Sequence, residues 1–100
     1  MDDLHRALTS EHILPTAYLY AVSMKGRCIL GRCLRHLHRS STGEFADDHR
    51  IRTSSVVSYS IRDGAMVVKT LSGSTYVLLN YSEGWSLDKV TTAVQRFITP

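Results

Sequence analysis

Two cysteines and two histidines, residue types that can bind a metal ion, lie within eleven residues of one another. They are Cys28, Cys33, His36 and His38. Structural zinc sites use such thiolate and imidazole ligands, and they usually space paired ligands about two to four residues apart around a tight turn. This segment lacks that spacing and that turn. We therefore expect no metal and no cofactor, and we interpret the cysteines as reduced core thiols and the histidines as surface residues.

Histidine, arginine and tyrosine also occur in the combination that a metal-independent ribonuclease needs. The candidates are His36, His38, His49, Arg50, Arg52 and Tyr59. Histidine can transfer protons near neutral pH, and arginine can stabilise negative charge that develops on a phosphate. However, no pair of a base and an orienting carboxylate can be read from the sequence. We predict that the protein is not an enzyme, and a toxin-like ribonuclease remains the second alternative.

A basic segment without acidic residues extends from Lys25 to Arg39. In the whole chain nine arginines outnumber three lysines, and the formal net charge is +3. The planar guanidinium group binds carboxylate or phosphate through two parallel hydrogen bonds and loses its water more easily than an ammonium group, so this bias favours a contact surface. The residues that we expect to contact a partner are Arg27, Arg32, Arg35, His36, His38, Arg39, Arg50 and Arg52.

This basic surface fits two kinds of partner. Arginine and tyrosine are enriched in protein interfaces, which favours a host protein or protein complex as the partner. A small barrel could instead bind single-stranded nucleic acid by charge and by stacking of bases on aromatic rings. The stacking candidates are Tyr18, Tyr20, Tyr59, Tyr76, Tyr81 and Trp85. Because the core needs most of these rings and a net charge of +3 is modest, we prefer the protein partner and keep a nucleic-acid-binding barrel as the alternative.

Length and composition favour a single folded domain over residues 1–100. The hydrophobic fraction is 43%, close to that of globular proteins. No apolar run approaches the roughly 18 residues that a membrane span requires. The first six residues are acidic and then mixed, unlike the basic start of a signal peptide. We therefore expect a cytoplasmic protein that does not interact with membranes.

Alternating apolar and polar residues predict five strands, at residues 16–23, 27–39, 50–61, 65–71 and 74–80. The dipeptides Lys25-Gly26, Asp63-Gly64 and Ser72-Gly73 fit the turns between them. Residues 27–39 also have the spacing of an amphipathic helix, but we prefer a long bent strand with a bulge near Gly31. Residues 40–48 are expected to form an exposed loop. In the third strand we expect one face to carry Ile51, Val57, Tyr59 and Ile61.

Two helices are expected outside the strands. Residues 2–8 can form a short N-terminal helix, with acidic residues at its positive end. A C-terminal helix begins after Ser86, a good N-cap, where Trp85 and Val90 can form a hydrophobic staple. The fold class is therefore α+β: a small five-stranded antiparallel sheet or an SH3-like, partly open barrel, with a short N-terminal helix and a C-terminal helix. A flat sheet covered by the helix is the alternative.

A pattern of strands and turns covers roughly the middle half of the chain. It comprises Gly31-Arg32 through His36, an "RTS-V-S" strand at residues 50–58 and a "V-T-SG-S-Y-L" hairpin at residues 67–78. This pattern resembles short orphan proteins encoded by bacteria and by their phages or plasmids. The resemblance implies an accessory protein of a mobile element, in some cases an inhibitor of a host defence effector of the anti-CRISPR kind. It carries no site residues over to this chain.

Overall fold

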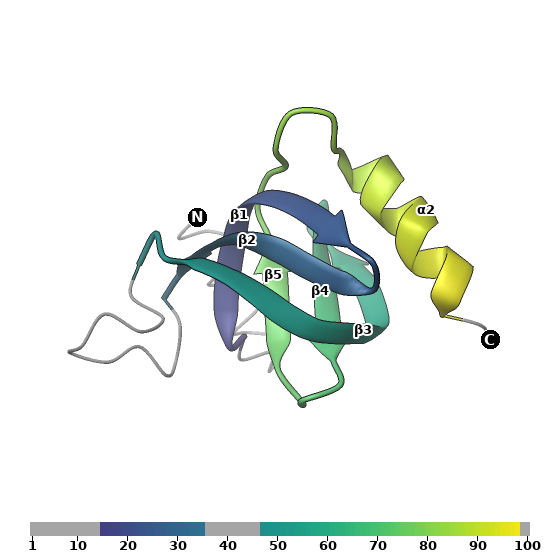
Figure 1. The fold of residues 1–100 in the computed structure, drawn as a ribbon, viewed down its shortest axis with the longest axis horizontal. Helices are drawn as coiled ribbons and strands as arrows, with labels where there is room; N and C mark the ends of the chain where they lie inside the picture. Colours follow the sequence, from purple (N-terminus) through teal and green to yellow (C-terminus); the bar gives the residue numbers. More distant parts are fainter. Residues whose placement is uncertain (1–14, 36–46, 99–100) are drawn as a thin grey trace.

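The computed structural model describes residues 15–35 and 47–98, in which five strands are followed by one helix (Figure 1). The elements are β1 (Ala17–Lys25), β2 (Cys28–Leu34), β3 (Arg50–Arg62), β4 (Ala65–Thr70), β5 (Thr75–Leu78) and α2 (Leu87–Phe97). The five predicted strands and the C-terminal helix are confirmed, and the ambiguous basic segment is a strand over residues 28–34. The predicted N-terminal helix, residues 40–46 of the predicted loop, His36, His38 and Arg39 lie outside the described residues.

The strands close into a ring in the order β1-β2-β3-β4-β5. Consecutive strands pair antiparallel, whereas β5 returns to pair parallel with β1, from Ala17 opposite Tyr76 to Leu19 opposite Leu78. Five strands that alternate in direction leave the first and the last pointing the same way, so closure of the ring requires one parallel pair. Four strand pairs are therefore antiparallel, as predicted, and the pair that closes the ring is parallel. The alternative of a flat sheet is wrong.

Three irregularities in strand register bend the ring. β1 carries one extra residue between Tyr20 and Ser23. β3 carries one opposite the stretch from Cys28 to Leu30 and another between Val56 and Ser58. Such bulges increase local twist and curvature, which a ring of few strands needs. The bulge expected near Gly31 lies opposite that residue, on β1. A Cβ at residue 31 would lie 3.1 Å from the carbonyl oxygen of Tyr20, so glycine permits this close approach.

The two extra residues in β3 change which side chains face the core. Val56 is buried, whereas Val57 and Ile61 are each 46% exposed. Ile51 and Tyr59 pack against the core as expected. A bulge shifts the period-two alternation by one residue. The expectation is therefore wrong for Val57, which lies at a bulge. Ile61 lies opposite the buried Met66 and keeps the face of Tyr59, but it is exposed near the end of the strand.

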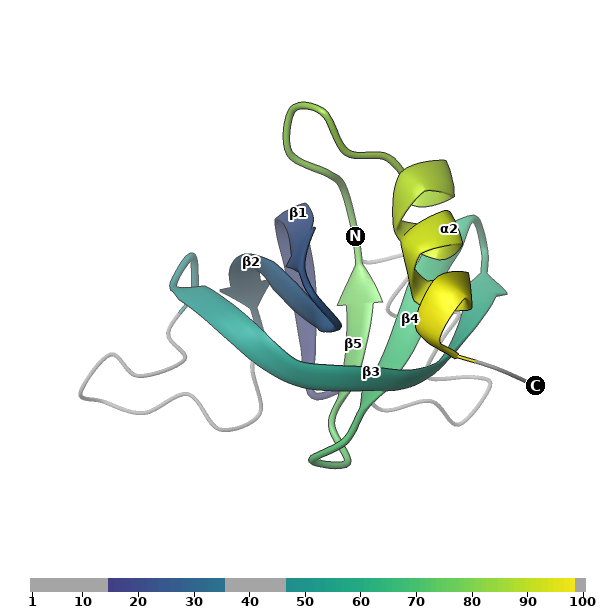
Figure 2. The same cartoon turned by 45° about the vertical axis from the view of Figure 1, so that its right-hand side comes forward.

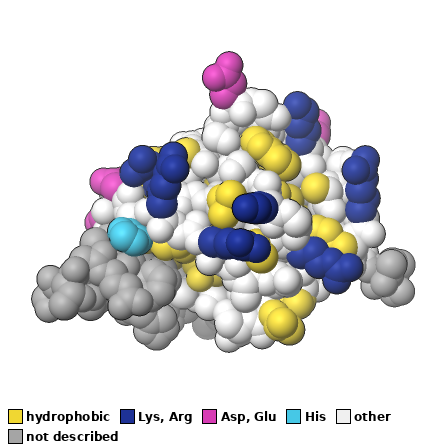
Figure 3. Space-filling model, in the orientation of Figure 1, with side chains coloured by type: hydrophobic (Ala, Val, Ile, Leu, Met, Phe, Trp, Pro, Cys, Tyr) yellow, Lys and Arg dark blue, Asp and Glu magenta, His cyan; other side chains and the backbone are white. Residues whose placement is uncertain are grey.

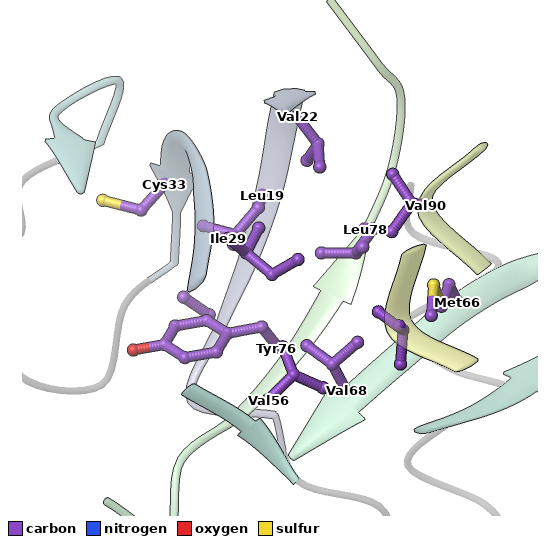
Figure 4. Close-up of a cluster of buried hydrophobic side chains, with 12 residues drawn as sticks. Leu19, Val22, Ile29, Cys33, Val56, Met66, Val68, Tyr76, Leu78 and Val90 are labelled. Carbon is purple, nitrogen blue, oxygen red and sulfur yellow. The ribbon is translucent and has the colours of Figure 1, made fainter. Parts of the chain in front are cut away.

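The core fills the ring and continues to α2. Figure 4 shows Leu19 of β1, Ile29 of β2 and Leu78 of β5 pointing toward one another, and all three are at most 1% exposed. Val90 and Val94 of α2 belong to the same cluster and are fully buried. The helix therefore seals the core from the side of β3 and β4, as the turned view also shows (Figure 2).

The start of α2 is built as its sequence predicts. The Ser86 side chain caps the helix by accepting a 3.1 Å hydrogen bond from the Lys89 amide. Trp85 packs against the cluster that contains Val90. Lys89 and Arg96 are exposed. Across the described part of the chain, the helical stretch is too short and too polar to cross a bilayer.

Candidate basic pocket

A surface pocket of about 460 Å³ opens where β1, β2 and β3 meet the segment that links β5 to α2. Its lining residues are Ala21, Ser23, Leu30, Gly31, Arg32, Arg50, Ile51, Arg52 and Ser82. Three arginines, two serines and several apolar residues therefore surround one hollow.

Strand register explains why the three arginines meet. Arg32 of β2 lies opposite Arg50 of β3, and Leu30 lies opposite Arg52. Residues two apart on a strand point to the same side, so Arg32 and Leu30 share a face with Arg50 and Arg52. Arg50 and Arg52 are exposed, and Arg32 is half-buried. Within the described stretches, no carboxylate forms an ion pair with any of these three guanidinium groups.

A hydrogen bond to the segment before β3 holds the Arg32 side chain in place. Its Nη1 donates a 3.0 Å hydrogen bond to the backbone carbonyl oxygen of Asp48. The Asp48 carboxylate accepts a hydrogen bond from the Tyr20 hydroxyl, and Tyr20 is the cross-strand neighbour of Arg32. The hydrogen bond to Asp48 raises the pKa of Tyr20 above its ordinary value of 10.0, with a further contribution from burial. Tyr20 is therefore a neutral donor at physiological pH.

The opposite wall of the pocket contains a residue in an unfavourable backbone conformation. Ala21 has φ of 51°, in the left-handed region that costs a residue with a side chain about 1–2 kcal/mol. Its amide donates a 2.7 Å hydrogen bond to the Asn80 side-chain oxygen, and the Val22 amide donates to the Asn80 carbonyl oxygen at 3.1 Å. The Ser82 amide and hydroxyl both donate to the Val22 carbonyl oxygen, at 3.0 and 3.2 Å. The segment after β5 thus stabilises this wall through hydrogen bonds.

The face of the molecule that carries β2 and β3 is basic with apolar areas between the charges. Figure 3 shows Lys and Arg side chains spread over this face, with hydrophobic side chains among them. The acidic side chains that are visible lie toward its margins. This arrangement favours a ligand that is negatively charged and partly apolar.

The residues expected to bind a partner do not all lie at this pocket. Arg32, Arg50 and Arg52 line it. Arg27 lies in the turn after β1, with its guanidinium carbon 5.6 Å from the centre of the Phe97 ring of α2. Arg35 follows β2, where its amide donates a 2.8 Å hydrogen bond to Asp47 Oδ1. The positions of His36, His38 and Arg39 are not described.

Several lining residues were not expected from the sequence. Leu30, Ile51 and Ser23 have the sequence pattern of strand residues only, and Ala21 and Ser82 give no sequence signal of a site. Gly31 was recognised only as a place for a bulge. A glycine within an otherwise apolar strand indicates close approach of another backbone, and here that approach brings β1 to the pocket.

The described residues that were considered for metal binding and hydrolysis form neither a metal site nor a single catalytic group. No group of three potential metal ligands occurs among the residues that the structure describes. Cys28 is half-buried and Cys33 is buried, both as free thiols, and burial raises the pKa of Cys33. Tyr59 accepts a 2.9 Å hydrogen bond from Gln95 of α2. It is separated from Arg52 by about 20 Å of extended strand, so these two side chains do not converge.

Two of the rings considered for base stacking belong to the interior. Tyr18 and Tyr76 are 1% and 7% exposed, and burial raises the pKa of both hydroxyls. Tyr18 forms a second apolar cluster with Val67 and Val77 on the other face of the strands. Neither ring therefore offers a free face to a base.

The fold and the pocket together define a small α+β domain with a closed five-strand ring and a basic, partly apolar hollow at its surface. Comparison of the chain with protein-family models, with curated proteins and with solved structures finds no match. The pocket itself is therefore the basis for a proposal about function.

Proposed function

We propose that the protein is a non-enzymatic binding protein that engages an acidic region of a partner protein through the basic pocket. The observation that carries this proposal is the convergence of Arg32, Arg50 and Arg52 on one hollow without an ion-paired carboxylate in the described part of the chain. Charged groups placed together without compensation repel one another, and an acidic partner removes that repulsion.

A protein partner suits this pocket better than nucleic acid does. The arginines surround a compact hollow with apolar lining, whereas single-stranded nucleic acid favours a basic track with exposed aromatic rings. Two candidate rings, Tyr18 and Tyr76, are buried. The net charge of +3 is also small for binding driven by phosphates alone.

The resemblance to short orphan proteins of phages and plasmids supports a more specific setting. In that setting the protein inhibits a host defence effector, in the manner of anti-CRISPR proteins, by occupying an acidic surface of the effector. The closed ring then acts as a rigid scaffold, comparable to a small SH3-like barrel, that holds the arginines in place. This role requires a cytoplasmic protein and no catalysis.

Charge reversal at the pocket tests the proposal. The double variant Arg50→Glu with Arg52→Glu reverses two exposed pocket charges. The matched control, Lys69→Glu with Arg96→Glu, makes the same change in net charge at exposed positions on β4 and α2. Affinity capture from host cells, read by mass spectrometry, should recover one protein with the native chain and the control, and lose it with the pocket variant. Equal recovery with both double variants would contradict the proposal.

Salt dependence separates protein binding from the nucleic-acid alternative. Each phosphate contact releases counterions, so affinity for an oligonucleotide falls steeply as salt increases. A gel-shift titration with single-stranded DNA and RNA should show no complex at physiological salt. A complex that depends on Arg50 and Arg52 under those conditions would favour the nucleic-acid-binding barrel.

A further inference from the structure

We infer that the pocket is a subsite for one glutamate side chain of the partner, with an apolar residue beside it in the partner's sequence. This inference rests on the proposed function and adds the chemical group that is recognised. It follows from three features of the pocket: its size, its two kinds of lining, and the fixed position of Arg32.

The pocket is larger than a small inorganic anion needs. Its volume is about 460 Å³, whereas a water molecule takes up about 30 Å³ of liquid. A carboxylate alone would leave most of the hollow open to solvent, where its attraction to the arginines is weakened by screening. A side chain with a stem, together with a neighbouring residue, fills the space and excludes water.

The lining divides into a charged part and an apolar part. Arg32, Arg50 and Arg52 supply planar groups that can each bind a carboxylate through two parallel hydrogen bonds. Leu30, half-buried and on the same face as the arginines, supplies apolar surface beside them. The two methylene groups of glutamate can cover that surface while the carboxylate reaches the guanidinium groups. A phosphodiester lacks an equivalent apolar stem at its charged group.

Part of the pocket is organised before a ligand binds. Arg32 is half-buried and is held by its hydrogen bond to Asp48, which leaves its other N–H donors for a ligand. Ala21 on the far wall is fixed in a costly conformation by Asn80. Groups that are already ordered lose less entropy on binding, so Arg32 and the Ala21 wall favour tighter binding than mobile groups would. Backbone strain beside a pocket also fits a binding role for that wall.

Peptides that differ only in charge test the inference on the full chain. The probe is the blocked pentapeptide Gly-Leu-Glu-Leu-Gly, and its control contains glutamine in place of glutamate. In NMR titrations, the glutamate peptide should shift the Nε–Hε signals of Arg32, Arg50 and Arg52 and the amide signal of Gly31. The glutamine peptide should bind about tenfold more weakly, because it lacks the charge-assisted bonds. The double variant Arg50→Gln with Arg52→Gln should show the same loss.

Further probes distinguish the sources of negative charge. Inorganic phosphate and a thymidine trinucleotide are titrated under the same conditions. Either one shifting the pocket signals at lower concentration than the glutamate peptide would overturn the inference in favour of a phosphate site. Equal binding of the glutamate and glutamine peptides, or no shift with either, would also overturn it.

The peptide titration and the cell capture can fail separately. If capture depends on Arg50 and Arg52 but the glutamate peptide does not bind, the glutamate subsite is wrong and the proposed function stands. If the peptide binds at the pocket but no captured protein depends on these arginines, the subsite is correct and the proposed function is wrong. The two results therefore test the chemistry of the pocket and the role of the protein independently.

Discussion

Arg32 and Arg50 lie directly opposite each other in the antiparallel ladder between β2 and β3. Like charges in this position destabilise a sheet, and opposite charges stabilise it. No carboxylate pairs with either residue within the described stretches. The chain thus carries an electrostatic cost at the place where its pocket opens, as expected for a site that is selected for binding and not for stability.

Replacing Arg50 with glutamate should make the protein more stable. The variant Arg50→Glu converts a like-charge pair into an opposite-charge pair with Arg32, which should raise the free energy of unfolding by about 0.2–1 kcal/mol. Urea denaturation at low salt measures this change. The control Arg52→Glu faces Leu30 and should change stability less. A lower stability of Arg50→Glu would show that the two arginines do not repel each other in the folded protein.

The contact between Tyr20 and Asp48 should be lost at alkaline pH. Its hydrogen bond needs a protonated Tyr20, whose pKa is raised above 10.0 in the folded protein, first by that bond and then by burial. The stability that it contributes is therefore fully present below the unfolded pKa of 10.0 and is lost as pH rises through the folded pKa. Titration of the Tyr20 ring carbon signals by NMR should give a midpoint above 10.0.

The variant Asp48→Asn serves as the control for that titration. It removes the carboxylate that stabilises the neutral form of Tyr20, so the midpoint should move down toward the ordinary value. The signals of Arg32 should respond to the same titration, because Arg32 donates a hydrogen bond to the carbonyl oxygen of Asp48. An unchanged midpoint in the variant would mean that Asp48 does not hold Tyr20 in solution.

Substitution with alanine should have different effects on stability at a buried leucine and at an exposed leucine. Leu19 is fully buried in the ring, whereas Leu71 is 74% exposed after β4. Leu19→Ala should lower the free energy of unfolding by about 2–5 kcal/mol, because it leaves a cavity. Leu71→Ala should change it by no more than about 0.5 kcal/mol. Thermal and chemical denaturation of both variants measure the difference, and similar losses would contradict the described packing.

The two cysteines should differ in reactivity. Cys33 is fully buried and burial raises the pKa of its thiol, whereas Cys28 is half-buried. The thiolate is the reactive form, so an alkylating reagent at mildly alkaline pH should label Cys28 well before Cys33. Mass spectrometry of digested protein locates the label, and the unfolded chain in urea provides the control with both cysteines modified. Rapid labelling of Cys33 in the native protein would contradict its buried position.

The elements of this fold could be predicted from local sequence, but their faces and closure could not. Alternation and the turn at Asp63-Gly64 are local signals, so all five strands could be recognised. Bulges are set by how two strands meet. Consequently the exposure of Val57 and the position of Ala21 depend on partners that are remote in sequence. The parallel pairing of β5 with β1 follows from the number of strands once the ring closes.

The candidate site could be predicted in part for the same reason. The arginine-rich sequence predicted Arg32, Arg50 and Arg52 as contact residues. The register between β2 and β3 brings them together. The sequence also predicted Arg27 and Arg35, which lie beyond the ends of β2. A count of charges along the sequence does not tell which of them share a face. The serine of the far wall, Ser82, comes from a segment whose path depends on how the ring is closed.

Closure between the first and the last strand has a consequence for biosynthesis. The Thr75 amide of the last strand donates to the Thr16 hydroxyl, a partner 59 positions earlier in the chain. During translation β1 therefore cannot pair with β5 until β5 has left the ribosome. The helix α2, which completes the core, emerges later still. Nascent chains that end before β5 would expose an open sheet edge to chaperones and proteases. Premature stop codons before the codon for Thr75 should thus remove the protein from the cell rather than leave a weakened form of it.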